Sequence, residues 1–191
     1  MRTSAAERKT NETLVNVNLN IDGKGKINID TSVKFLDHMI GELAVHSFID
    51  LEVNARGDLK HHIVEDVAIT LGEALKQALG DRKSIRRFGQ AIVPMDDALA
   101  LVSIDLVQRP YSDVELDLWC GQIEDMASED IQHFIETLTS SLQFTLHVHV
   151  MRGTNNHHKV EAVFKGLALS LREAWEIDPR RKDIPSSKGK M

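Results

Sequence analysis

Cysteine, proline and aromatic residues are all scarce in this chain. Its 191 residues include one cysteine, Cys120, four prolines and 5% aromatic residues. A single cysteine excludes an intramolecular disulfide and a thiolate-rich zinc site, and it favours the reduced cytoplasm as the location. The longest apolar stretch, residues 98–107, is interrupted by Ser103 and Asp105 and is much shorter than the roughly 20 residues that span a bilayer. We therefore expect neither a disulfide framework nor a membrane anchor.

The chain also lacks an excess of positive charge. It has 23 Lys and Arg against 29 Asp and Glu, which gives a formal net charge of −6. This balance argues against a nucleic-acid partner. Residues 1–13 contain no apolar run and so do not resemble a signal peptide. With 42% hydrophobic residues the composition is that of a globular protein, with room for one large domain or two smaller ones.

Histidine is plentiful, and most of the nine histidines belong to an internal repeat. The segment HHIVED at 61–66 recurs 96 positions later as HHKVEA at 157–162. His38 in DHMIGEL likewise has a counterpart 95 positions later, His133 in QHFIETL. Because a distant histidine and a His-His pair recur together, we interpret the chain as two copies of one unit.

Each copy has the pattern of a helix, a strand and a second helix. Residues 48–56 and 144–152 alternate apolar and polar side chains as half-buried strands do, and apolar residues recur at helical spacing after each His-His pair. Additional strands are predicted ahead of each unit, at 14–21, 26–29, 98–107 and 113–119. The expected fold is α+β, a duplicated half-domain in which helices cover one face of a mainly antiparallel sheet and a pseudo-twofold axis relates the halves.

These patterns divide the chain into three parts. Residues 1–90 are expected to form the first α+β repeat and residues 91–178 the second. Residues 180–191 carry five Lys or Arg against one Asp, so we expect 179–191 to be an extended basic C-terminal arm.

The repeated histidines and glutamates are typical of metal ligands. Residues four apart share a helix face, so His61 can act with Glu65, and His157 with Glu161. Adjacent residues diverge by about 100°, so the two histidines of a pair are expected to serve different ions. Two sites of three histidines and one glutamate result, and ligands without sulfur suit a first-row divalent ion. The candidate ligands are His38, His61, His62, Glu65, His133, His157, His158 and Glu161.

A lone histidine on a helix is more often hydrogen-bonded or solvated than a ligand, but its recurrence in both copies favours ligation. His147 and His149 differ, because they alternate with apolar residues along a strand. We expect them on the polar face of a sheet and not at a metal.

Several segments together resemble one enzyme family, imidazoleglycerol-phosphate dehydratase. They are LDHM at 36–39, HHIVED at 61–66, RRFG at 86–89, QRPY at 108–111, QHF at 132–134, NNHHKVEAVFK at 155–165 and IPSSKG at 184–189. The resemblance extends over almost the whole chain. It implies a dehydratase of histidine biosynthesis that acts on a small phosphorylated imidazole, with two manganese ions per active site. It further implies a homo-oligomer of twenty-four subunits with active sites at subunit contacts.

The resemblance also implies roles for residues outside the ligand set. It places Glu12 as a base near the substrate, with His46 as a rival for proton transfer, and Lys165 as a lysine on the substrate side. The residues that it implies for binding the substrate phosphate are Arg87, Arg109, Ser186, Ser187 and Lys188.

The chain departs from the family pattern just before the first His-His pair. The family has a longer loop with two aspartates, whereas this chain has GDLKHHI. Ile63 stands where the family prefers threonine, and Gln132 replaces a common glutamate. Because such aspartates could orient the ligating imidazoles, we expect altered support around one metal.

Two other functions fit part of the pattern. A dinuclear metal phosphoesterase would use paired divalent ions to activate water, although such sites are usually rich in bridging aspartate. A noncatalytic metal-bridged assembly protein would explain the repeat but has no use for Arg87, Arg109 and the SSK sequence of the arm.

Overall fold

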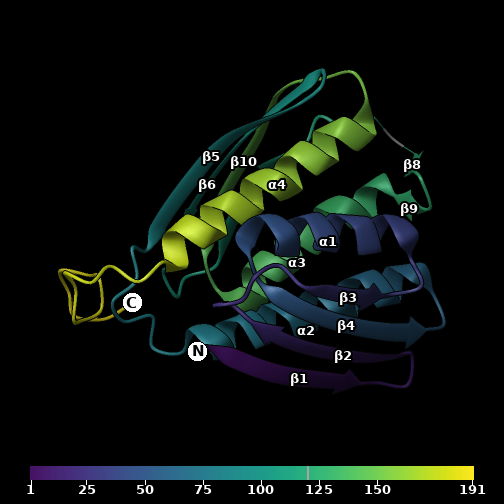
Figure 1. Ribbon diagram of the computed structural model, residues 1–191. Helices are drawn as coiled ribbons and strands as arrows, with labels where there is room; N and C mark the ends of the chain where they lie inside the picture. Colours follow the sequence, from purple (N-terminus) through teal and green to yellow (C-terminus); the bar gives the residue numbers. More distant parts are fainter. Residues whose placement is uncertain (120) are drawn as a thin grey trace.

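Two four-stranded sheets form the outer layers of the molecule and four helices lie between them (Figure 1). The computed structural model describes residues 1–119 and 121–191. Cys120, on which the expected location rests, lies outside the described residues.

The two sheets have the same strand order and the same strand directions. In the first, three neighbouring strands are antiparallel and the fourth is parallel to its neighbour; the order is β1 (Thr3–Lys9), β2 (Thr13–Asn20), β4 (Asp50–Gly57) and β3 (Ile27–Asp30). The second repeats this as β5 (Phe88–Met95), β6 (Ala98–Asp105), β10 (Thr145–Arg152) and β7 (Tyr111–Glu115). The predicted duplicated, mainly antiparallel α+β fold is confirmed.

The helices of the two halves pack in crosswise pairs. They are α1 (Lys34–Ser47), α2 (Lys60–Leu79), α3 (Ser128–Leu142) and α4 (Asn156–Trp175). Helix α2 covers the first sheet and packs on α3, while α4 covers the second sheet and packs on α1. The first turns of α2 and α4, where the His-His pairs lie, thereby meet helices from the other half.

Two edge strands of the four-stranded sheets were missing from the prediction, and so was the short hairpin of β8 (Gln122–Ile123) and β9 (Met126–Ala127). Strand β1 buries few side chains and has no apolar run, since it is held mainly by backbone pairing with β2. Strand β5 contains Pro94, which is compatible with an edge strand. Gly89 lets β5 approach α4, because a Cβ there would collide with the Ser170 carbonyl oxygen. The strand predicted at 113–119 lies at Tyr111–Glu115.

The apolar interiors of the two halves are continuous, and a buried cation lies where they meet. Arg82 is 1% exposed and follows α2. Its guanidinium donates to the carbonyl oxygens of Leu106 (2.9 Å), Leu142 (2.5 Å) and Gln143 (2.7 Å). Burial lowers the pKa of Arg82 to about 10, against the opposing influence of Asp105. The residue remains charged at neutral pH and joins the end of α2 to the end of α3.

After α4 the chain continues through turns, with one isolated bridge between Ile85 and Ile177. The predicted boundaries at residues 90 and 178 stay predictions. Within the described residues, none of the helices is long and apolar enough to cross a membrane.

Candidate active site

The first group of candidate ligands lies between α1 and α4 and is called here the α1–α4 group: His38, His157 and Glu161. The Nε2 atoms of His38 and His157 lie 3.4 and 3.2 Å from Oε2 of Glu161. His157 and Glu161 share a helix face as their spacing predicts, and α1 brings His38 from the other half. One ligand atom from each residue therefore faces a common point.

The second group lies between α2 and α3 and is called here the α2–α3 group: His61, Glu65 and His133. Nε2 of His133 is 3.3 Å from Oε1 of Glu65, and the rings of His61 and His133 stack with their centroids 5.3 Å apart. In both groups the ligand atoms lie within 4.8 Å of one another. The crosswise packing of helices thus brings together six of the eight candidate ligands.

The remaining two, His62 and His158, belong to neither group. The ring of His62 contacts Asp58 and Glu12, and that of His158 contacts Asp97 and Asp96. This separation is the divergence expected of adjacent helical residues. In each His-His pair the first histidine belongs to a ligand group, and the second contacts carboxylates outside both groups.

Every histidine of the two pairs is held at Nδ1 by a carboxylate. The bonds run from His61 to Asp130 (2.7 Å), from His62 to Asp58 (2.8 Å), from His157 to Glu124 (3.1 Å) and from His158 to Asp97 (2.7 Å). A carboxylate at Nδ1 fixes the ring and leaves Nε2 free to bind a metal. These carboxylates were not predicted.

Despite the shortened loop before the first pair, Asp58 supplies a carboxylate that supports an imidazole of that pair. It lies four residues before His62 and supports that imidazole although the aspartate pair of the family is missing. The hydrogen bond from His62 lowers the pKa of Asp58, and the same bond raises the pKa of His62. Backbone N–H donors, that of Thr154 first, hold the pKa of Asp97 far below its usual range. Both carboxylates stay ionised at neutral pH.

Acidic and basic side chains surround the α1–α4 group. Nζ of Lys165 donates to Glu161 at 2.6 Å and lies 3.5 Å from Glu42. His46 is 3.0 Å from Glu42, so Glu42 links two of the residues predicted to act in proton transfer. Burial raises the pKa of Glu161, but Lys165 and His38 outweigh it and the net shift is downward. Burial lowers the pKa of Lys165, and its bond to Glu161 reverses this to a net increase.

Glu12, the predicted base, lies at a different place. Its carboxylate is 3.6 Å from Nδ1 of His62 and half-exposed. In one chain it therefore lies beside His62, the member of the first pair that belongs to neither group.

The residues predicted to bind phosphate come together around an open cavity of about 360 Å³. Its walls include Arg87, Arg109, Ser186, Ser187 and Lys188. Two nitrogen atoms of Arg87 donate to Asp105 at 2.6 and 2.8 Å and a third donates to the Pro185 carbonyl oxygen at 2.9 Å. The bond to Asp105 raises the pKa of Arg87. Arg87 thus ties the C-terminal arm to β6.

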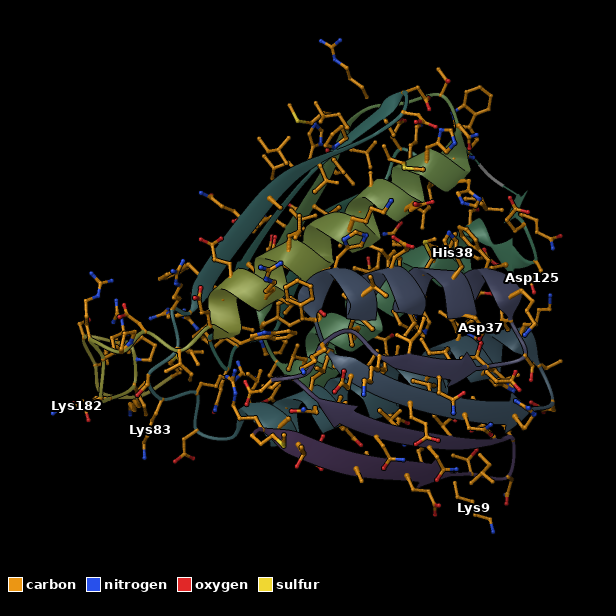
Figure 2. All side chains as sticks on the ribbon, viewed as in Figure 1. Lys9, Asp37, His38, Lys83, Asp125 and Lys182 are labelled. Carbon is orange, nitrogen blue, oxygen red and sulfur yellow. The ribbon has the colours of Figure 1, made fainter. Side chains whose placement is uncertain are left out.

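This cavity is far from the α1–α4 group within one chain. His157 lies in the first turn of α4, whereas the backbone N–H of Arg87 donates to Ala174 in its last turn. A rise of 1.5 Å per residue makes that separation roughly 25 Å. Figure 2 shows His38 near one end of the molecule and Lys182 of the arm near the other. A molecule as small as a phosphorylated imidazole cannot contact both places in one chain.

The ligand groups fit a first-row divalent ion. Their donors are imidazole nitrogen and carboxylate oxygen without sulfur, and in each group the donor atoms converge. The Nδ1 carboxylates supply the outer support typical of metal-binding histidines. The residues present therefore match what a metal site requires.

Comparisons of the sequence and the structure with known proteins all point to one family. Residues 31–171 match the model of the family described as imidazoleglycerol-phosphate dehydratase. A relative of that name from Methanothermobacter thermautotrophicus is 53% identical over 194 residues, covering 100% of this chain and 98% of the relative. One from Acetivibrio thermocellus is 46% identical and covers 96% of both chains. The crystal structure of IGPD from Pyrococcus furiosus superposes with a TM-score of 0.85 at 39% identity and covers 97% of this chain and 99% of its own.

Proposed function

Because the chain belongs to the imidazoleglycerol-phosphate dehydratase family, we propose that it is the carbon-oxygen lyase that removes water from imidazoleglycerol phosphate in histidine biosynthesis. The product is imidazole-acetol phosphate. Neither the phosphoesterase nor the noncatalytic assembly protein is favoured by this membership. A cytoplasmic location is proposed with the biosynthetic role.

The α1–α4 and α2–α3 groups are proposed to hold the two manganese ions. Each group supplies two histidines and one glutamate, and His62 and His158 of further copies complete the predicted sets. A divalent ion bound at each group would stabilise negative charge on the substrate imidazole, which would favour departure of the hydroxyl group from the carbon attached to the ring. The observation that carries the proposal is the convergence of these nitrogen and oxygen donors. The carboxylates at Nδ1 of the four paired histidines support it.

The protein's own acids and bases move the protons. The carboxylate of Glu12 removes the proton from the second side-chain carbon, the one that keeps its hydroxyl group. Lys165, kept protonated by Glu161 and Glu42, donates toward the hydroxyl group that leaves the carbon attached to the imidazole as water. His46 joins the same path through Glu42. The resulting enol tautomerises to the ketone.

The phosphate is proposed to bind the cavity of another copy of the chain. Arg109, Lys188 and the hydroxyl groups of Ser186 and Ser187 suit a phosphate dianion. Arg87 anchors the arm that carries three of these residues. The separation of roughly 25 Å within one chain supports an active site shared between copies, and the homo-oligomer of twenty-four subunits is proposed on the family resemblance.

An assay with imidazoleglycerol phosphate tests the proposal. Turnover to the ketone is expected with manganese and is expected to stop after exhaustive chelation. Arg109→Ala should raise KM by one to two orders of magnitude, or about 1.5–3 kcal/mol, because a charge-assisted bond to phosphate is lost. Its metal content should match the wild type. Release of inorganic phosphate without ketone formation would instead identify a phosphoesterase.

A further inference from the structure

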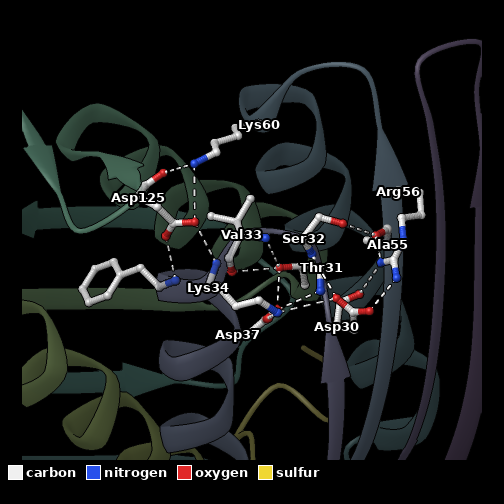
Figure 3. A network of polar contacts seen from close by, with 11 residues as sticks. Asp30, Thr31, Ser32, Val33, Lys34, Asp37, Ala55, Arg56, Lys60 and Asp125 are labelled. Carbon is white, nitrogen blue, oxygen red and sulfur yellow. Dashed lines mark hydrogen bonds and ion pairs between the residues drawn. The ribbon is translucent and has the colours of Figure 1, made fainter.

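Helix α1 begins without an acceptor from the residue that precedes it. Val33 occupies the N-cap position and has no polar side-chain atom, although the first N–H groups of a helix need acceptors. Asp125 supplies them from 90 residues away: its two carboxylate oxygens accept from the backbone N–H groups of Lys34 and Phe35, each at 2.9 Å (Figure 3). The start of the helix that carries His38 therefore depends on a distant side chain.

The same residue also binds the start of α2. Nζ of Lys60, the first residue of α2, donates to the carbonyl oxygen of Asp125 at 2.6 Å and lies 3.4 Å from its carboxylate (Figure 3). Lys60 directly precedes His61, a member of the α2–α3 group. Asp125 is thus a bridge between one helix of each ligand group.

Asp125 stands at the two-residue tip of the hairpin of β8 (Gln122–Ile123) and β9 (Met126–Ala127). The other tip residue, Glu124, has a φ of +53° and binds His157. A non-glycine residue in this region is strained and persists only where its surroundings hold it. Both side chains at the tip are engaged with elements of the ligand groups.

We infer that this hairpin tip couples the two ligand groups and that Asp125 is the positioning residue that does so. The tip fixes the first turn of α1 relative to the first turn of α2. A shift of one helix against the other would displace His38 relative to His61 and disturb both groups together. This inference rests on the proposed function in one respect: it takes the two ligand groups to be metal sites.

Manganese affinity is the first test, measured by chelator competition on the purified, assembled protein. Asp125→Ala frees the tip from α1, and Lys60→Met frees it from α2. Each is expected to weaken binding about tenfold, the lower end for groups that support metal ligands. Because either change breaks the same bridge, the double variant should lose much less than the product of the two. Asp125→Asn, which keeps one acceptor oxygen, should recover part of the loss.

A matched control is provided by Asp50, whose carboxylate accepts from the backbone N–H groups of Lys24 and Lys26 at 2.9 and 3.0 Å. Asp50→Ala removes the same kind of interaction away from both ligand groups. Its manganese affinity should stay within twofold of the wild type. Equal affinity in Asp50→Ala and Asp125→Ala, or fully multiplicative losses in the double variant, would overturn the inference.

Hydrogen exchange of the metal-free protein supplies a second readout. Asp125→Ala should accelerate exchange in segments 33–39 and 59–66, whereas Asp50→Ala should change neither. Acceleration confined to 33–39 would reduce Asp125 to a local cap and overturn the coupling. If the wild type bound no manganese, the proposed function would fail, and this exchange experiment would still decide the coupling.

Discussion

The two ligand groups have the same composition but different surroundings. Glu161 of the α1–α4 group has a side chain 8% exposed and lies 2.6 Å from Lys165. Glu65 of the α2–α3 group is 41% exposed, and the repeat places Ile69 where the other copy has Lys165. The duplication thus gives both groups their candidate ligands, while among the described residues an ammonium group pairs with the glutamate of only one.

The same contrast holds on the partner helices. Glu42 and His46 on α1 correspond by the repeat to Thr137 and Ser141 on α3. These α1 side chains and Lys165 form a continuous series of contacts beside the α1–α4 group. We propose that the groups are equivalent in binding metal and unequal in moving protons.

Removing one ligand from each group tests the equivalence and should have the largest effect. His157→Ala and His61→Ala are both expected to lower kcat at least about a thousandfold, since a metal contributes several kcal/mol of charge stabilisation. Each variant should also lose bound manganese. Its oligomer should then dissociate, because metal ions shared by two chains are proposed to hold the subunits together. Activity, metal content and size-exclusion elution measure the three effects. Retained turnover in either variant would contradict the catalytic role of that group, and an unchanged oligomer would contradict bridging by metal.

Replacing the ammonium group tests the inequality. Lys165→Met is expected to reduce kcat about a hundredfold, the lower end for general acid-base groups, with manganese content unchanged. Ile69→Met, at the corresponding position of the other copy, should leave kcat within twofold. Similar losses in the two variants would mean that the groups do not differ in proton transfer.

Acid sensitivity gives Lys165→Met a second readout. Lys165 is a main cause of the lowered pKa of Glu161. A carboxylate with a lowered pKa stabilises the fold above its unfolded-state pKa and loses that contribution as the pH falls through the folded value. The metal-free variant should therefore lose less stability than the wild type between pH 7 and pH 3 in urea denaturation. An identical acid loss would show that Lys165 does not stabilise ionised Glu161.

The smallest effect concerns the caps of the two ligand helices. Asn155 caps α4 by accepting from the N–H groups of His157 and His158, whereas α2 has Leu59 at the N-cap. Asn155→Ala should lower the free energy of unfolding by about 1 kcal/mol, and Leu59→Asn should raise it by about 0.5–1 kcal/mol. Urea denaturation measures both. If neither substitution changed the free energy of unfolding, the Nδ1 carboxylates alone would fix these first turns.

The convergence of the candidate ligands was predictable because their spacing is local in sequence. His157 and Glu161 share a helix face by spacing alone, and the repeat identified their counterparts. The supporting carboxylates were not predictable, because they reach their histidines across 33 to 69 positions: Glu124, Asp97 and Asp130. Asp58 is the one supporting carboxylate that the sequence could have indicated, since it lies only four residues before His62.

The fold shows the same division. Strands with alternating side chains, such as β4 and β10, were predicted because alternation reports burial. Strand β1 was missed because it has no buried side chain and is held by backbone pairing with β2. Strand β5 was missed because it contains Gly89 and Pro94, which are uncommon in strands. The cavity around Arg109 needed the family resemblance, since isolated basic residues are mostly solvated.

Arg82 has a consequence for how the chain folds during synthesis. Its carbonyl partners at Leu142 and Gln143 leave the ribosome 60 and 61 residues after it, and a buried cation without partners costs several kcal/mol. The first half therefore cannot complete its interior before α3 has emerged, although it resembles an autonomous unit. We expect a fragment of residues 1–90 to remain unfolded alone and to fold with residues 91–191. The first half would fold alone only if another residue replaced Arg82, or if a second copy in a homodimer supplied carbonyl oxygens to its guanidinium.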